Sequence, residues 1–196
     1  ITEDYLKEII SKNKNLEYKI INLVAKDYPV TEQGLNSNFN NPFCLSTEEY
    51  LASLKITAGS TYHLLRQITK INFYKIDIIL MSSIYERKLP DPYLYSNKDI
   101  EIFKPIAYSS GKAAQSPLLK QAAKFLGERG GRCNCLSFGG IRGNQDINFV
   151  KKYSQKTPQG KMIEIEEVLK MILWLFIESP YSINGENIMV DGGFSL

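Results

Sequence analysis

A parallel β-sheet covered by helices on both faces, the doubly wound α/β fold, is the architecture that this sequence predicts. Short, almost continuous apolar runs alternate with longer segments whose apolar residues recur at helical spacing. Such runs are typical of parallel strands buried on both faces, and their alternation with helices is typical of crossover connections. With 43% hydrophobic and 23% charged residues, the 196-residue chain has the composition and length to bury a full core. We therefore expect a single domain over residues 1–196.

Each expected element rests on a local signal. The strands are the short apolar runs, which end in small polar or glycine residues. Ser46 or Thr47, followed by two glutamates, marks the start of a helix, and Pro117 predicts a kink because proline lacks a backbone N–H. The polar stretch over 27–42, the proline-containing stretch after Ser83 and the polar stretch over 142–162 predict loops. The expected strands cover 18–24, 76–81, 132–138 and 187–190, and the expected helices cover 2–13, 46–70, 108–130 and 164–177.

The charge balance and the cysteines exclude several classes of function. A net charge of +3 gives no support for nucleic-acid binding, and no apolar run is long enough to span a membrane. Cys133 and Cys135 alternate on one face of an expected strand and lack the partner ligands that a zinc site needs. The sequence therefore predicts a cytoplasmic protein with no metal site, no nucleic-acid partner and no membrane segment.

Tyr108 and Lys112 form the pattern with the clearest chemical meaning. Four residues apart in an expected helix, they lie on one face, one turn above the other. An ammonium near a phenol favours the phenolate, so the pattern predicts a lowered pKa for Tyr108 and a group able to exchange protons at neutral pH. The spacing alone is common, and its weight comes from Ser83, which ends the preceding apolar run.

With these residues in order, the chain resembles the short-chain dehydrogenase/reductase family. The resemblance implies a Rossmann-like sheet and binding of NAD or NADP, with hydride transfer between the nicotinamide and a carbon bearing an alcohol or carbonyl group. It places the site at the carboxyl ends of the strands, where open α/β sheets bind ligands. The segments that carry it are 79–83, 107–114, 132–141 and 183–194.

The resemblance also assigns roles to individual residues. Ser83 would hydrogen-bond the substrate oxygen, and Tyr108 would transfer the proton. Lys112 would bind the nicotinamide ribose and lower the pKa of Tyr108. The cofactor-binding residues that it implies are Tyr108, Lys112, Phe138, Gly139, Gly140 and Ile141, the last four at a strand end that would face the nicotinamide.

The long insertion between Ser83 and Tyr108 is most similar to family members in bacterial nonulosonate or flagellin-glycan sugar pathways. That similarity implies a small-molecule substrate, a nucleotide- or phospho-sugar, covered by the polar loop over 142–161. The basic side chains available there for a phosphate group are Arg142, Lys151 and Lys152. The family also implies a homodimer or homotetramer.

Departures from the family pattern keep an alternative open. The 196 residues contain no G-x-x-x-G-x-G turn for the cofactor pyrophosphate, so we expect the first βα units of the fold to lie upstream of Ile1. The family's Asn-Asn-Ala-Gly turn has no match at 23–26, its helix asparagine is not evident over 54–60, and Phe138 replaces the usual proline. The alternative is a catalytically impaired descendant that serves as a binding or oligomeric scaffold.

Overall fold

A parallel sheet forms the centre of the computed structural model, which describes residues 8–9, 12, 15–28, 39–96 and 101–196. Each strand pairs in parallel with the next, so all carboxyl ends meet at one edge of the sheet. The predicted parallel α/β sheet is confirmed, whereas the helix expected over 2–13 falls largely outside the described residues. In sheet order, the four strands are β1 (Glu17–Asn22), β2 (Lys75–Ser83), β3 (Gly131–Phe138) and β4 (Asn187–Val190).

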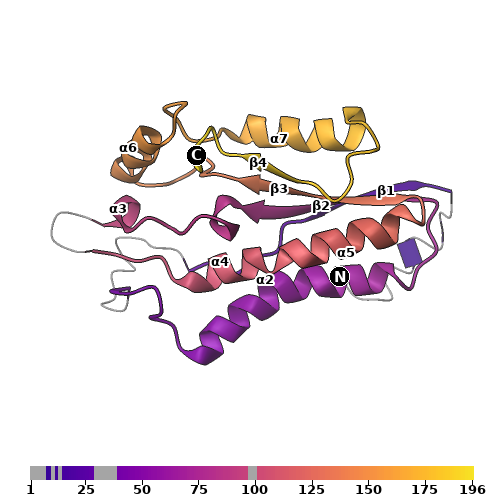
Figure 1. The fold of residues 1–196 in the computed structure, drawn as a ribbon, viewed down its shortest axis with the longest axis horizontal. Coiled ribbons are helices and arrows are strands. Elements are labelled where there is room, and N and C mark those ends of the chain that lie inside the picture. The colour runs from indigo at the N-terminus through magenta and orange to yellow at the C-terminus, as the bar shows by residue number, and fades with distance from the viewer. Residues whose placement is uncertain (1–7, 10–11, 13–14, 29–38, 97–100) are drawn as a thin grey trace.

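Helices lie on both faces of the sheet (Figure 1). One face carries α2 (Thr47–Ile68), α4 (Ile106–Ala113) and α5 (Gln115–Gly127), and the other carries α7 (Ile165–Leu173) with the π-helical turn η3 (Trp174–Glu178). Beyond the carboxyl ends of the strands lie the 3-10 turn η2 (Ile84–Glu86), α3 (Pro92–Tyr95) and α6 (Ile147–Lys156). Within the described residues, no helix has the length and apolar character to cross a bilayer, and no potential metal-ligand cluster forms.

The strand residues divide between two cores. Ile78 of β2 packs in the core beneath α5, whereas its neighbour Ile79 packs beneath α7 with Val168. Successive side chains of a strand point to opposite faces, so β2 must be apolar at consecutive positions to be buried on both. Cys133 and Cys135 both lie in the core beneath α5, as their spacing predicts.

Two helix boundaries follow local sequence signals. The Ser46 hydroxyl accepts from the Glu49 backbone N at 3.2 Å, and the Glu49 carboxylate accepts from the Ser46 backbone N at 2.8 Å, forming a capping box at the start of α2. The helix that carries Tyr108 is interrupted at Ala114, three residues before Pro117. Pro117 has no N–H to donate to the preceding turn, so the predicted kink becomes a break between α4 and α5.

The polar stretch over 142–162 contains α6, where the sequence predicts a loop. The Asp146 carboxylate caps this helix by accepting from the backbone N of Asn148 at 2.7 Å, and Tyr153 is buried. An aspartate followed by apolar residues at helical spacing was the available signal, but the many polar residues between them obscured it.

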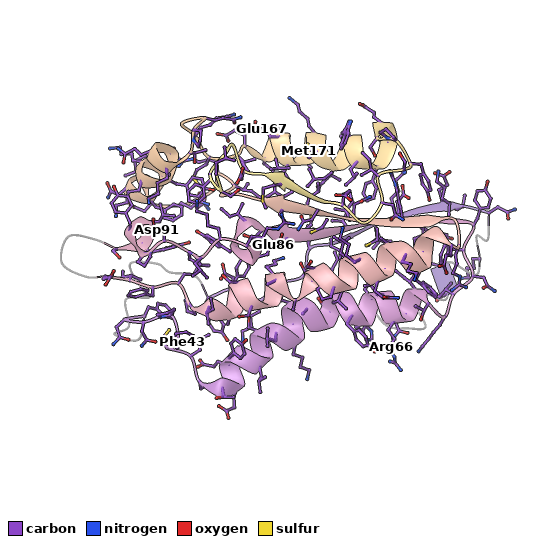
Figure 2. The ribbon with its side chains drawn as sticks, in the orientation of Figure 1. Phe43, Arg66, Glu86, Asp91, Glu167 and Met171 are labelled. Atoms are coloured by element: carbon purple, nitrogen blue, oxygen red, sulfur yellow. The ribbon has the colours of Figure 1, made fainter. Side chains whose placement is uncertain are left out.

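Two lysines attach α6 to α3 beyond the sheet edge. Lys152 donates its ammonium hydrogens to the carbonyl oxygens of Tyr93 and Ser96. Lys156 forms an ion pair with Asp91, which is labelled in Figure 2. The attachment makes α6 and α3 neighbours although they are far apart in the sequence.

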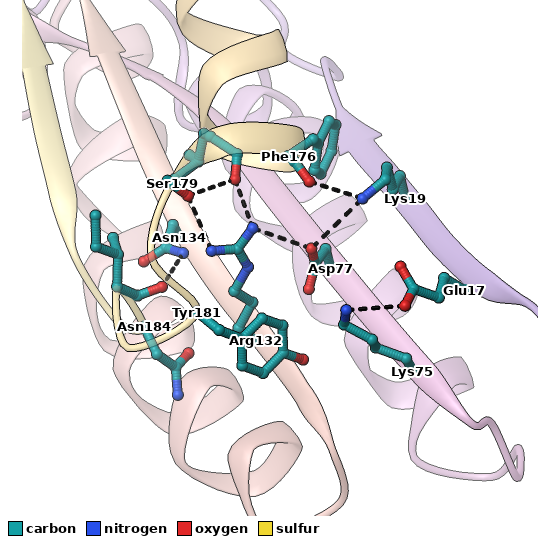
Figure 3. A network of polar contacts seen from close by, with 12 residues as sticks. Glu17, Lys19, Lys75, Asp77, Arg132, Asn134, Phe176, Ser179, Tyr181 and Asn184 are labelled. Atoms are coloured by element: carbon teal, nitrogen blue, oxygen red, sulfur yellow. Dashed lines mark hydrogen bonds and ion pairs between the residues drawn. The ribbon is translucent and has the colours of Figure 1, made fainter.

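A buried ion pair joins β2, β3 and the end of η3 (Figure 3). Arg132 lies 3.1 Å from Asp77, and the two side chains are 4% and 6% exposed. Arg132 also donates to the Leu175 carbonyl at 2.5 Å and to the Ser179 hydroxyl at 3.0 Å. Lys19 of β1 approaches the same carboxylate at 3.8 Å. Since Asp77 and Arg132 are opposite each other in the strand register, the pair reinforces the alignment of β2 with β3.

Candidate active site

The carboxyl end of β2 brings the three predicted catalytic residues together. Ser83 ends β2, Tyr108 lies in the first turn of α4, and Lys112 follows one turn later. The Ser83 hydroxyl lies close enough to Tyr108 to lower the pKa of its phenol, and Lys112 Nζ lies 5.8 Å from the centroid of the Tyr108 ring. A hydroxyl, a phenol and an ammonium therefore share one edge of the sheet, an arrangement suited to proton transfer to a bound oxygen.

Lys112 is a buried ammonium with unused hydrogen-bonding capacity. It is 3% exposed, and it donates to the carbonyl oxygen of Met81 at 2.5 Å. Burial lowers the pKa of Lys112 to about 8, although the nearby Cys135 and Asp27 act in the opposite direction. An ammonium has three N–H groups, and within the described residues Met81 is its one hydrogen-bond partner. The remaining donors are available to a ligand.

The pKa of Tyr108 shifts in the direction opposite to the sequence prediction. Burial, the Asp27 carboxylate and the Tyr85 phenol raise it and the neighbouring Ser83 hydroxyl lowers it, which leaves the pKa at about 12. The ammonium of Lys112 does not offset this rise. The predicted lowering is therefore wrong for the protein alone, and the phenol is protonated at neutral pH.

The strand end predicted to face the nicotinamide, 138–141, lies at the same edge of the sheet. Phe138 is opposite Ser83 in the register of β3 with β2. The N–H of Gly140 donates to the hydroxyl of Tyr153 at 2.5 Å. A Cβ added at Gly140 would lie 2.8 Å from the Tyr153 ring, so glycine permits this close packing.

Gly111 allows α4 to lie close to α2. A Cβ added there would lie 2.9 Å from the Cβ of Thr57, so Gly111→Ala should push the two helices apart. We expect a loss of about 1–3 kcal/mol in the free energy of unfolding, measured with urea. Turnover should fall as well, because Tyr108 and Lys112 flank Gly111. The matched control is Gly59→Ala on α2, whose nearest contact would be 3.7 Å away and which should stabilise by about 0.5–1 kcal/mol. Equal effects of the two substitutions would contradict this packing.

The segment after β1 is held by buried polar contacts that the sequence analysis missed. Asn22 donates to the Thr61 hydroxyl at 2.8 Å and accepts from the backbone N of Val24 at 3.2 Å. Thr57 is fully buried within the stretch where no asparagine was evident, and its hydroxyl accepts from the Lys26 backbone N at 3.0 Å. An asparagine and a threonine thus anchor the segment that leads to the site.

A second lysine, also missed, faces Tyr108. Lys104 Nζ lies 5.3 Å from the centroid of the Tyr108 ring and 2.8 Å from each carboxylate oxygen of Asp27. The Lys104 side chain is 7% exposed and that of Asp27 is 43% exposed. Both residues fall in stretches predicted as loops and are far apart in the sequence, so no spacing pattern could have paired them.

Glu86 is a third missed residue, buried just beyond β2 (Figure 2). Its carboxylate accepts from the Ser82 hydroxyl at 2.8 Å and from the side-chain amide of Asn187, and it lies 3.1 Å from Arg87 Nε. These contacts connect the carboxyl end of β2 with the first residue of β4 beneath the site.

The three side chains predicted to bind a phosphate differ in whether they are already engaged in other contacts. Lys152 is engaged by the two main-chain carbonyls that attach α6 to α3, so it is not available for a phosphate in this arrangement. Arg142 and Lys151 are exposed. A hollow of about 340 Å³ between 159–167 and 189–193 contains none of the predicted site residues.

Comparison with known proteins decides the family. The model of the family described as enoyl-(acyl carrier protein) reductase matches residues 25–195. The chain belongs to the short-chain dehydrogenase/reductase family. Among similar proteins, an uncharacterised oxidoreductase of Haemophilus influenzae is 35% identical over 102 residues, which cover 45% of this chain and 35% of that protein. Post-translational flagellin modification protein A of Campylobacter coli is 27% identical over 182 residues, which cover 91% of this chain and 68% of that protein.

Solved structures agree on the fold of this short-chain dehydrogenase/reductase. A short-chain dehydrogenase from Leptospira borgpetersenii with bound NAD+ matches with a TM-score of 0.77 and 23% identity, over 100% of this chain and 72% of that one. The chain thus spans about a third to about two thirds of the length of the two curated relatives.

Proposed function

We propose that this short-chain dehydrogenase/reductase transfers a hydride between a nicotinamide cofactor, NAD or NADP, and the carbon of an alcohol or carbonyl group. The observation that carries the proposal is the proximity of the Ser83 hydroxyl and the Tyr108 phenol at the sheet edge, with Lys112 one turn away. Similarity to a dehydrogenase with bound NAD+ supports the choice of cofactor. When bound, the nicotinamide supplies or accepts the hydride.

Tyr108 would hold the proton that the substrate oxygen receives. Because its pKa is raised to about 12, the phenol is protonated at neutral pH and can donate to a carbonyl oxygen during reduction. In the oxidation direction the phenol must first ionise, so the rate should rise as the pH approaches that pKa. The Ser83 hydroxyl oxygen accepts from the Tyr85 backbone N at 3.2 Å, which leaves the Ser83 hydrogen to donate to an oxygen.

Lys112 has hydrogen-bond donors that can bind the ribose of the cofactor. One of its N–H groups goes to the Met81 carbonyl, and the others can donate to ribose hydroxyls at the floor of the site. The residues described here therefore fit the nicotinamide end of the cofactor. The 196 residues contain no Gly-rich turn suited to the pyrophosphate.

A sugar carrying a phosphate or a nucleotide is the proposed substrate. The similarity to the flagellin modification protein over 91% of the chain supports this class. Tyr85 and Tyr95, whose hydroxyl oxygens lie 2.9 Å apart, add polar groups beside Tyr108 that can bind sugar hydroxyls.

A turnover assay tests the proposed function. The protein is incubated with NAD+ or NADP+ and a panel of nucleotide sugars, sugar phosphates and their unphosphorylated forms, and reduction of the nicotinamide is followed by its absorbance. We expect reduction with at least one phosphorylated sugar. Absence of turnover throughout the panel, together with absence of NADH and NADPH binding, would favour the scaffold alternative.

We also propose a homodimer or homotetramer. Along α7 and η3, apolar side chains at four-residue spacing remain half or more exposed: Ile165, Leu169, Leu173 and Ile177. Light scattering should give two or four times the chain mass of 22.3 kDa, and a monomer mass would contradict the proposal.

A further inference from the structure

A second ammonium lies at Tyr108, in addition to the one that the proposed proton transfer uses. Lys104 precedes Tyr108 by four residues and lies just before α4. Its Nζ is 5.3 Å from the centroid of the Tyr108 ring and 5.9 Å from that of Tyr95. A lysine that is 7% exposed is unusual unless its charge is paired, and Asp27 supplies the pairing with both carboxylate oxygens at 2.8 Å.

Asp27 is held in place from α2. The preceding residue, Lys26, donates its backbone N–H to the Thr57 hydroxyl at 3.0 Å, and its carbonyl oxygen accepts from the Ser53 hydroxyl at 3.1 Å. Both hydroxyl residues are fully buried. The carboxylate therefore projects from a fixed stretch of backbone.

Lys104 is held by main-chain contacts on both sides. Phe103 donates its backbone N–H to the carbonyl oxygen of Phe39 at 2.9 Å, and Ile106 donates to that of Pro42 at 3.0 Å. The ion pair consequently joins the segment that contains Asp27 to the segment just before the first residue of α4. Such anchoring reduces the conformational entropy that a surface ion pair would lose on forming.

The groups that face the Tyr108 phenol come from every element packed around it. They are Lys104 and Lys112 on the α4 side, Asp27 after β1, Ser83 at the end of β2, and Tyr85 in η2 with its partner Tyr95 in α3. A cation favours the phenolate and an anion opposes it. Lys104 Nζ lies as close to the Tyr108 ring as Lys112 Nζ does, and Asp27 raises the pKa of the phenol.

We propose that Asp27 and Lys104 act as a positioning pair that sets the pH at which Tyr108 exchanges its proton. Asp27 offsets the charge of Lys104 and keeps the phenol protonated, while Lys104 prevents Asp27 from suppressing ionisation altogether. The proposal deepens the proposed function and rests on it for its catalytic consequence. Neither residue needs to touch the reacting atoms.

Titration of a single labelled tyrosine tests the pair without substrate or cofactor. Difluorotyrosine is incorporated at position 108 alone, because its fluorines bring phenol ionisation towards neutral pH and report it by fluorine NMR. We expect Asp27→Asn to lower the ionisation midpoint by about one pH unit and Lys104→Met to raise it by a similar amount. Lys104→Arg should leave the midpoint close to that of the parent, because the charge is retained.

A distant ion pair between β1 and β2 provides the control. Glu17 and Lys75 lie 2.9 Å apart at the opposite end of β1 and β2, so Glu17→Gln and Lys75→Met should not move the midpoint. If Lys104→Met fails to fold, the double variant with Asp27→Asn removes the unpaired carboxylate and should titrate near the parent. An unmoved midpoint in Asp27→Asn, or an equal shift in the control variants, would overturn the pair's role. Either result would not count against the proposed hydride transfer, because the turnover assay tests that proposal separately.

Discussion

Replacing Tyr108 with phenylalanine should lower turnover by about 10²–10⁴-fold while leaving nicotinamide binding nearly unchanged. The substitution removes only the phenolic hydroxyl, which lies near Ser83 and would exchange a proton with the substrate oxygen. The ring remains in place between the lysines, 5.3 Å from Lys104 Nζ and 5.8 Å from Lys112 Nζ. Steady-state rates with the substrate found in the panel, together with calorimetric titration of NADH and NADPH, measure the two effects separately.

The control for this prediction is Tyr62→Phe. Tyr62 lies on α2 and is 58% exposed, so loss of its hydroxyl should change neither rate nor binding. A wild-type rate in Tyr108→Phe would contradict the proton-transfer role assigned to the phenol.

Replacing Arg132 with methionine should lower the free energy of unfolding by about 3–5 kcal/mol. The substitution leaves the Asp77 carboxylate buried, and among the described residues Lys19, 3.8 Å away, remains as its ion-pair partner. One oxygen of Asp77, Oδ1, is buried and has no hydrogen-bond partner in the part of the chain that the structure describes, so the carboxylate depends heavily on the guanidinium at its other oxygen. The carbonyl of Leu175 would also lose its donor. Urea unfolding followed by circular dichroism measures the change.

The exposed pair between Lys75 and Glu17 provides the comparison. Its side chains are 32% and 47% exposed, so Lys75→Met should cost less than about 1 kcal/mol. Because both lysine and arginine are changed to methionine on adjacent strands, the two variants differ chiefly in burial. A similar small loss in Arg132→Met would show that the buried pair contributes no more than the exposed one.

Local sequence signals were sufficient for most of the fold. The strands were predictable because β2 and β3 must be apolar at consecutive positions to be buried on both faces. The start of α2 was predictable because Ser46 and Glu49 form a capping box within four residues. Ser83 and Tyr108 could be expected to meet because a parallel topology brings the carboxyl ends of strands to one edge.

The features that the sequence did not predict depend on tertiary contacts. The pKa of Tyr108 follows from burial and from Asp27, neither of which the spacing of Tyr108 and Lys112 reveals. The pairing of Asp27 with Lys104 joins two stretches predicted as loops. The helix α6 depends on Tyr153 packing against Phe194 near the carboxyl end of the chain, with ring centroids 4.4 Å apart.

Binding of the nicotinamide end of the cofactor at Lys112 is the central claim, and calorimetry tests it most directly. Wild-type protein and Lys112→Met are titrated with NADH, NADPH and reduced nicotinamide mononucleotide, which lacks the adenylate half. We expect the wild type to bind, and Lys112→Met to bind each ligand about tenfold more weakly, because a charge-assisted hydrogen bond to the ribose is lost. Equal affinities of the two proteins, or no binding by the wild type, would contradict the claim.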